Sequence, residues 1–235
     1  MSITENTIEF INKTHSQFHA IEGLRKLLVA SGYIELKENE PFNLKIGNKY
    51  FVTRNNSSLI AFALNESKRF HIVATHSDSP TFKLKPEANL VCPTSSRLST
   101  EGYGGMIIST WLDRPLSVAG RVFVKDGENI AECLVDLDED LCIIPNVCIH
   151  FNRKINDGYE YNKAVDTLPL VSCDGNFDFT AYLASNLKTS EENIVGHDLY
   201  LYNRDDAKLI GPKRNLFASS KIDNLECTYL GLRSL

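Results

Sequence analysis

The feature that most constrains the fold is an apolar run that ends in a polar cluster, at residues 69–80 (RFHIVATHSDSP). Phe70 and residues 72–74 are apolar with a β-branched centre, and a Ser/Asp/Pro cluster bounds them downstream, so the pattern predicts a short buried strand. His76 and Asp78 then lie where that strand ends. Because ligands and reacting groups gather beyond the carboxyl ends of strands in open α/β sheets, this position indicates a functional site.

The pairing of His76 with Asp78 fits metal chemistry. A neutral imidazole is a good zinc ligand, and a carboxylate two residues on can accept the other ring N–H, which fixes the tautomer and orientation of the ring. The alternative is a surface loop in which one His and one Asp occur by chance, because the tripeptide His-x-Asp alone is a weak signal.

A second polar block lies at residues 219–225 (SSKIDNL). A helix-like pattern follows it at residues 226–232. Asp223 lies just before this pattern, where it can cap a helix N-terminus, and that is the alternative to a ligand role.

These two stretches and the blocks between them carry a resemblance. The blocks are, in chain order, THSDSP at 75–80, YGG at 103–105, STWLDRPL at 109–116, AGRV at 119–122, IHFNR at 149–153 and KIDN at 221–224. With these blocks in this order, the chain resembles the aspartyl aminopeptidase family of zinc metallopeptidases, from about Ile8 to its end. Several separate motifs in order are far more specific than one.

The resemblance implies an active site with two zinc ions bridged by a carboxylate. His76 would hold one ion, Asp223 would bridge both, and Asp78 would orient His76. Two ions about 3.5–4 Å apart can polarise the scissile carbonyl, lower the pKa of a shared water and hold the free amino terminus of a peptide. Mixed His and carboxylate shells also accept manganese or cobalt. The implied reaction removes N-terminal residues from peptides, acidic ones (Asp or Glu) if the family name carries over.

The middle of the chain, residues 87–213, resembles the family's inserted β-rich domain, which serves dimerisation and oligomerisation. By the same resemblance, His150 joins Asp78 as a candidate catalytic residue, because it would reach a neighbouring subunit's active site and stabilise the tetrahedral intermediate. Its alternative is a strand-end histidine that is satisfied locally. The expected partners are peptide substrates and further copies of this chain.

The fold class expected is α/β: an incomplete zinc-peptidase α/β domain, formed by residues 1–86 and 214–235, interrupted by the β-rich association domain. Apolar residues recur at helical spacing over residues 3–30, with Ser31-Gly32 as the stop, which predicts one amphipathic helix. The runs at 49–54 and 59–64 flank a polar tetrapeptide and predict a hairpin.

Short strand-like runs separated by turn residues fill the insert. They lie at residues 116–125, 130–137, 141–144, 147–151 and 198–202, and the first two flank a DGEN turn. The acidic run at residues 136–140 is interpreted as a solvated turn, because the glycine and terminal glutamate of a calcium loop are missing.

Composition excludes some classes of function. The net charge is −5 and the pI is about 5.7, which argues against a general affinity for nucleic acid. The N-terminal residues lack the features of a signal peptide, and no apolar run approaches the length of a membrane span, so we expect a cytoplasmic protein. The six cysteines show no zinc-finger spacing and are interpreted as reduced core residues.

The sequence also departs from the family. Beyond the Asp-Asn block, family members carry a Glu-Glu pair, a further Asp and a final His, and this sequence has none of them. Because each zinc needs about three protein ligands plus water, His76 and Asp223 cannot build a closed dinuclear site. We therefore expect little or no peptidase activity from this chain alone. It is either a fragment of a zinc aminopeptidase or, in the alternative, a non-catalytic truncated homologue that acts as an assembly module.

Overall fold

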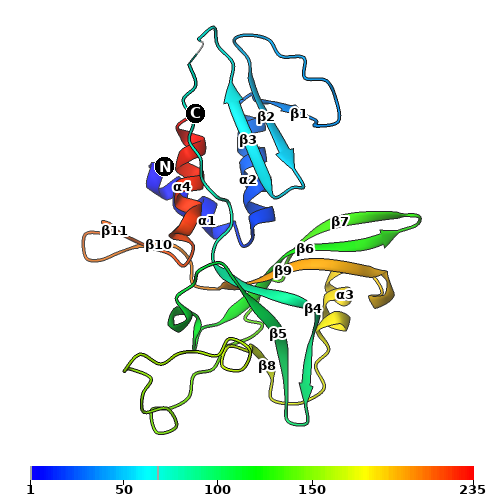
Figure 1. Cartoon of the computed structure of the whole chain (residues 1–235), viewed down its shortest axis with the longest axis vertical. Helices are drawn as coiled ribbons and strands as arrows, with labels where there is room; N and C mark the ends of the chain where they lie inside the picture. Colours follow the sequence, from blue (N-terminus) through cyan, green and yellow to red (C-terminus); the bar gives the residue numbers. More distant parts are fainter. Residues whose placement is uncertain (1, 68) are drawn as a thin grey trace. The chain divides into compact units, whose positions relative to one another are not determined.

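The computed structural model describes residues 2–67 and 69–235, and the chain divides into two compact units (Figure 1). The discontinuous unit comprises the residues up to Ser79 together with Asp206–Leu235, and the inserted unit is Pro80–Asp205. These boundaries lie a few residues before those expected at 86 and 214. The mixed α/β class is confirmed, whereas the association role of the insert stays a prediction.

Two helices open the discontinuous unit where one was expected. They are α1 (Ile3–Asn12) and α2 (Gln17–Ala30). The single helix was wrong because the Ser16 hydroxyl accepts the N–H of His19 and starts a new helix, a local change to which the apolar spacing is blind. The predicted stop after α2 is confirmed, since Gly32 adopts φ +79°.

A three-stranded sheet follows the helices, in the order β1-β2-β3. Its strands are β1 (Ile34–Leu36), β2 (Lys49–Arg54) and β3 (Ser58–Ala63). β2 and β3 form the predicted antiparallel hairpin, and β1 pairs parallel with β2. Leu28 of α2 and Phe51 of β2 share a buried cluster with Tyr33, so α2 covers one face of this sheet.

The C-terminal part of the discontinuous unit consists of a short hairpin and a helix, namely β10 (Lys208–Ile210), β11 (Leu216–Ala218) and α4 (Ile222–Arg233). α4 packs on α1, with the rings of Phe10 and Tyr229 5.2 Å apart. Asp223 and Asn224 have non-helical φ/ψ values, so the regular helix begins at Leu225.

The run at residues 69–75 is not a buried strand. Phe70 is 87% exposed and Ile72 is 83% exposed, and no strand of the described chain pairs with this segment. The prediction was wrong because an apolar run becomes a buried strand only where neighbouring strands satisfy its backbone and another layer covers its side chains.

The inserted unit is built on a six-stranded sheet in the order β7-β6-β9-β4-β5-β8, and all its pairings are antiparallel. The strands are β4 (Thr81–Cys92), β5 (Ser95–Tyr103), β6 (Leu116–Asp126), β7 (Asn129–Asp136), β8 (Leu170–Ser172) and β9 (Ile194–Asn203). The hairpin predicted around the DGEN turn is confirmed as β6 and β7, and the strand predicted at 198–202 is confirmed as part of β9.

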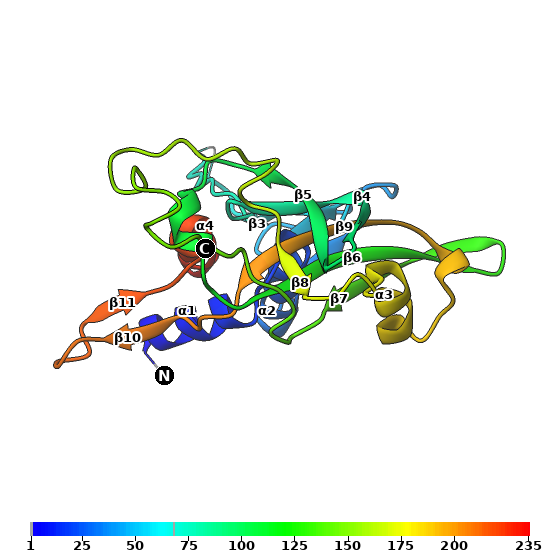
Figure 2. The same ribbon diagram turned by 90° about the horizontal axis from the view of Figure 1, so that it is seen from below.

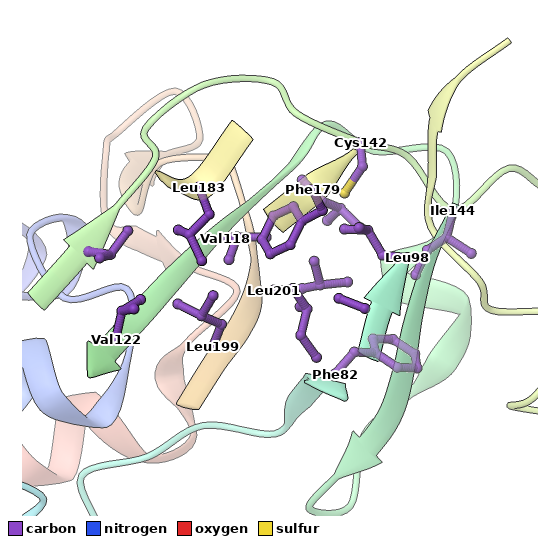
Figure 3. Close-up of a cluster of buried hydrophobic side chains, with 14 of the residues drawn as sticks. Phe82, Leu98, Val118, Val122, Cys142, Ile144, Phe179, Leu183, Leu199 and Leu201 are labelled. Atoms are coloured by element: carbon purple, nitrogen blue, oxygen red, sulfur yellow. The ribbon is translucent and has the colours of Figure 1, made fainter. Parts of the chain in front are cut away.

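One face of this sheet carries the core of the inserted unit. The unit also contains α3 (Phe179–Leu187) and two short 3-10 helices, Ile108–Trp111 and Glu191–Asn193. Figure 3 shows Phe179 and Leu183 of α3 in the same cluster as side chains of β6 and β9. The carboxylate of Asp178 accepts the N–H groups of Thr180 and Ala181 and so caps α3.

The strands expected at 141–144 and 147–151 do not form. Residues 142–144 make only isolated bridges, and 147–151 lie in an exposed turn region. The reason lies in the side chains: the N–H of Asn146 donates to Asp113 and the N–H of Val147 donates to the Asn146 side chain, so these donors are satisfied outside a ladder.

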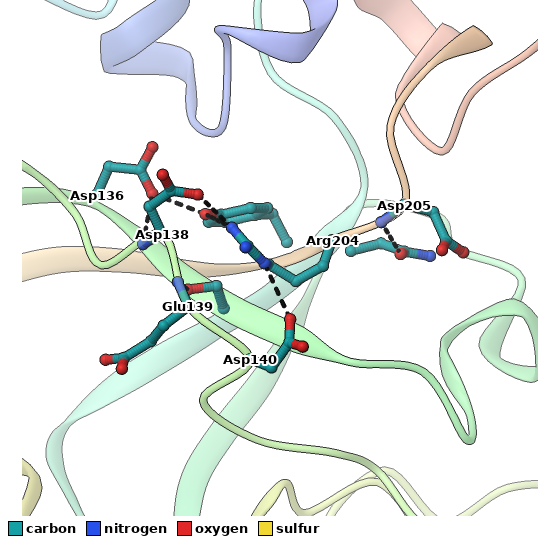
Figure 4. Close-up of polar contacts among 9 residues, drawn as sticks. Asp136, Asp138, Glu139, Asp140, Arg204 and Asp205 are labelled. Atoms are coloured by element: carbon teal, nitrogen blue, oxygen red, sulfur yellow. Dashed lines mark hydrogen bonds and ion pairs between the residues drawn. The ribbon is translucent and has the colours of Figure 1, made fainter.

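The acidic turn at 136–140 is held by the side chain of Arg204 (Figure 4). Arg204 forms ion pairs with Asp138 and Asp140, and the hydroxyl of Tyr202 donates to Asp136 over 2.8 Å. These contacts raise the pKa of Arg204. The turn is therefore exposed as expected but tied to the end of β9.

The expectation that the cysteines are core residues is wrong for four of them. Cys142 is buried, and burial raises the pKa of its thiol to about 12. Cys133 is half-buried. The exposed ones are Cys92, Cys148, Cys173 and Cys227.

Candidate metal centre

His76, Asp78 and Asp223 meet in the discontinuous unit. The Nδ1 atom of His76 lies 2.8 Å from Oδ1 of Asp78, and its Nε2 atom lies 3.2 Å from Oδ1 of Asp223. The extended segment before β4 supplies the first two residues, and the start of α4 supplies the third. Asp223 thus joins two residues that precede it by 145 and 147 positions in the sequence.

Three hydrogen bonds hold the His76 segment in place. The N–H of Asn224 donates to the carbonyl of Asp78 over 3.4 Å, and the hydroxyl of Thr228 donates to the carbonyl of His76 over 2.7 Å. The hydroxyl of Ser77 donates to the carbonyl of Ser57 over 3.3 Å. The segment is therefore tethered to the first turns of α4 and to the β2–β3 turn.

The carboxylate of Asp223 faces the imidazole of His76. The N-cap position of α4 is occupied by Lys221, and the two residues that follow Ile222 leave helical geometry. The contact with His76 and the non-helical backbone at Asp223 favour its ligand role over the capping role that the sequence left open. The peptide bond between Asp223 and Asn224 is cis.

The donors fit half of a metal shell. Two donors bound to the same tetrahedral zinc at about 2.0–2.1 Å lie about 3.3 Å from each other, close to the 3.2 Å between Nε2 of His76 and Oδ1 of Asp223. If Nδ1–H donates to Asp78, the lone pair of Nε2 is free for the metal. Among the described residues, no three His, Cys, Asp or Glu side chains are placed to hold one metal ion together, so the shell is incomplete in this part of the chain.

The site is open to solvent. The side chain of His76 is 54% exposed, that of Asp78 30% and that of Asp223 69%. Water competes with exposed donors for a metal, so these donors alone would bind a metal weakly.

His150 lies in an exposed turn of the inserted unit, where the N–H of Phe151 donates to the carbonyl of Cys148 over 3.0 Å. Its expected location at a strand end is therefore wrong. Its role at a neighbouring active site stays a prediction.

Sequence reasoning missed the part played by Thr228. This polar side chain is buried and lies on the same stripe of α4 as Leu225 and Tyr229. A threonine on an otherwise apolar helix face was the available signal, because a buried hydroxyl needs a hydrogen-bond partner. Asn224 stood within the recognised block but had been given no role.

No helix in the described part of the chain is both long and apolar enough to cross a membrane.

Comparison with known proteins places this chain in a family. The family described as "Aminopeptidase I zinc metalloprotease (M18)" matches residues 10–235. The "Probable M18 family aminopeptidase 2" of Clostridium novyi is 39% identical over 97% of this chain and 55% of its own length. The chain therefore spans about half the length of the curated relatives that it matches.

Solved structures agree with this assignment. The structure described as the Ape4 and Nbr1 complex matches with a TM-score of 0.90 and 29% identity, over 98% of this chain and 49% of the other. The S. cerevisiae mApe1 dodecamer matches with a TM-score of 0.73 and 23% identity, over 91% of this chain and 50% of the other, which shows the fold alone. The resemblance found in the motifs is thus confirmed, and the chain belongs to the M18 family of zinc metalloaminopeptidases.

Proposed function

We propose that this chain carries one side of the active site of a zinc-dependent aminopeptidase that removes acidic N-terminal residues, Asp or Glu, from peptides. The observation that carries the proposal is the 3.2 Å separation of Nε2 of His76 and Oδ1 of Asp223, with Asp78 on the other ring nitrogen. Family membership supplies the reaction class. The acidic preference rests on the resemblance to aspartyl aminopeptidases.

The proposed roles follow from the donor atoms. His76 holds a metal through Nε2, and Asp78 is a positioning residue that fixes the tautomer of His76. Asp223 has two carboxylate oxygens, so it can hold two metals at once. When bound, zinc polarises the scissile carbonyl and lowers the pKa of a bound water. Manganese or cobalt fits the same donors.

The proposal includes inactivity of the 235-residue chain alone. Two protein ligands leave each metal short of the roughly three that a catalytic zinc site requires. The match covers 55% of the C. novyi relative, and we infer that the further ligands and the general base lie in the remainder of such relatives.

Self-association is also part of the proposal. One structural relative is described as a dodecamer, and we infer that this chain forms homo-oligomers through its inserted unit in the cytoplasm. His150, in an exposed turn, is the candidate contact with a neighbouring active site.

A second candidate function is a non-catalytic assembly module. It is favoured by the inserted unit, which has a six-stranded sheet and a buried core of its own, whereas the metal site brings together only two proposed ligands, His76 and Asp223.

The test compares this chain with a chimera in which it continues into the segment of the C. novyi relative that follows the matched region. We expect the chain alone to show no hydrolysis of Asp- or Glu-peptides. The chimera should bind about two zinc ions per subunit and cleave these peptides faster than Leu-peptides. Zinc content is measured by elemental analysis and cleavage by release of the N-terminal residue.

Variants of the chimera assign the roles. Asp223→Asn should abolish hydrolysis, and Asp78→Asn should lower zinc affinity about 10–100-fold. The matched control is His71→Ala, which removes another exposed histidine from the same segment and should change neither quantity. A chimera that folds but neither binds zinc nor cleaves peptides would favour the assembly module.

A further inference from the structure

The inserted unit has one long edge strand without the usual protection. β7 lies at the end of the strand order, and among the described strands it pairs with β6 alone, over eight residues and without a bulge. Its sequence, NIAECLVD, contains no Lys, Pro or Gly. Natural edge strands are commonly blocked by Lys, Pro, a bulge or short length, because an open edge templates pairing with another chain. The β6–β7 turn projects past α3 in Figure 1 and Figure 2.

The two acidic residues of β7 are already engaged within the unit. Glu132 lies 3.3 Å from Arg121, and Asp136 accepts the hydroxyl of Tyr202 over 2.8 Å. Arg121 partly neutralises the charge of Glu132, and the Tyr202 hydroxyl solvates that of Asp136, so both repel an incoming strand less than unpartnered carboxylates would. On the same face, Ile130 is 63% exposed and Leu134 is 42% exposed. The edge thus offers apolar contacts to a partner strand.

The chemistry of β7 selects its own copy as the partner. A two-fold axis perpendicular to the sheet makes the strands antiparallel and places residues of the same face opposite each other. If the axis passes beside Glu132, this carboxylate lies opposite its own copy. If the axis passes beside Leu134, Glu132 lies opposite Asp136 of the second copy. Centring on Cys133 avoids both like-charge pairs: Glu132 lies opposite Leu134, and Ile130 lies opposite Asp136.

We propose that β7 pairs with β7 of a second copy, antiparallel about Cys133, so that two six-stranded sheets become one. The inference rests on the self-association part of the proposed function and is independent of zinc and of hydrolysis.

The first test measures the mass of the full 235-residue chain, without zinc, by analytical ultracentrifugation at several concentrations. We expect a dimer of twice 26.4 kDa. Ile130→Asp should raise the dimer dissociation constant about tenfold or more, since in this register it places a carboxylate opposite Asp136 of the second copy. Ile60→Asp, which changes an exposed isoleucine of β3, should leave the dissociation constant unchanged. A chain that stays monomeric, or equal association of both variants, overturns the proposal.

The second test determines the register. The exposed cysteines, Cys92, Cys148, Cys173 and Cys227, are first replaced by Ser. Diamide should then oxidise the Cys133 thiols of two copies to one intermolecular disulfide. The two electrons and two protons that the thiols lose reduce diamide to the corresponding hydrazine. Opposed residues in antiparallel strands lie within the range that a disulfide spans. Covalent dimers that disappear with Cys133→Ser support the register. Dimers that do not crosslink overturn the register, and a ladder of larger species overturns the closed pair.

Discussion

Two apolar runs of similar character have opposite fates in this molecule. In the inserted unit, residues 116–122 form the first part of β6 and are buried throughout, with β9 on one side and, from Ala119 on, β7 on the other. In the discontinuous unit, residues 69–75 are also apolar and rich in β-branched residues, yet they are exposed and unpaired with any described strand. An apolar run can therefore form a strand, but it does so only where neighbouring strands are present to pair with it.

The same contrast separates the charged groups of the two units. Asp198 lies between Lys83 and Arg121, 2.9 Å from a nitrogen of each, and Arg121 is nearly buried. The Arg54–Glu38 pair of the discontinuous unit is exposed. Surface pairs contribute little to stability, whereas removing one partner of a buried cluster leaves an uncompensated charge.

The largest expected effect compares two phenylalanines. Phe82→Ala, at a fully buried position beside Trp111, should lower the free energy of unfolding by about 3–5 kcal/mol. Phe70→Ala should change it by less than about 0.5 kcal/mol, because its ring is already in solvent. Urea unfolding followed by circular dichroism measures both, and the fluorescence of the single tryptophan, Trp111, reports the inserted unit.

Equal losses from the two substitutions would contradict the comparison, since they would mean that Phe70 is covered in solution. In the chimera that supplies further chain, Phe70→Ala should become costly if new strands and helices bury this run.

A medium effect is expected from Asp198→Asn. Burial alone raises the pKa of Asp198, but hydrogen bonds from Lys83 and Arg121 outweigh it and hold the pKa below its ordinary value of 3.8. A depressed pKa in the folded state stabilises the protein above the unfolded value, and this stability is lost as the pH falls through the folded value. At pH 7 the free energy of unfolding of the variant should be about 1–3 kcal/mol below that of the wild type. On acidification below pH 4, the free energy of unfolding of the variant should fall by less than that of the wild type.

The control for this prediction is Glu38→Gln, which removes an exposed partner and should leave the unfolding midpoint unchanged. Urea midpoints at pH 7 and pH 3 give both comparisons. If the urea midpoint of Asp198→Asn fell between pH 7 and pH 3 by as much as that of the wild type, a group other than Asp198 would be responsible for the acid sensitivity.

The sequence predicted those elements whose partners are local. The hairpins β2–β3 and β6–β7 were predicted because the two strands of each hairpin are only a few residues apart in sequence. The run at 69–75 was mispredicted because no described strand lies beside it to satisfy its backbone. Residues 147–151 were mispredicted because the side chains of Asp113 and Asn146 accept the N–H groups of Asn146 and Val147. The break between α1 and α2 depended on one serine hydroxyl.

The candidate site shows the same limit. Motif order identified His76, Asp78 and Asp223, and the structure places all three together. Thr228 and Asn224, which hold the His76 segment, make contacts with its backbone carbonyls. Such contacts leave a weak trace in sequence because any extended segment offers carbonyl acceptors, and only the fold selects which of them a side chain reaches.

The smallest expected effect tests how the unpaired run is held. Thr228→Val removes the hydroxyl that donates to the carbonyl of His76 while it keeps the side-chain volume, so the free energy of unfolding should fall by only about 1 kcal/mol. Amide exchange in residues 69–78 should nevertheless accelerate, because this segment has few other tethers, whereas exchange in β6 should not change. Thr228→Ser retains the donor and should exchange at the wild-type rate. If Thr228→Val left exchange in 69–78 unchanged, apolar contacts such as that between Val73 and α4 near Gly231 would be sufficient to hold the segment, and the difference from β6 would be one of degree.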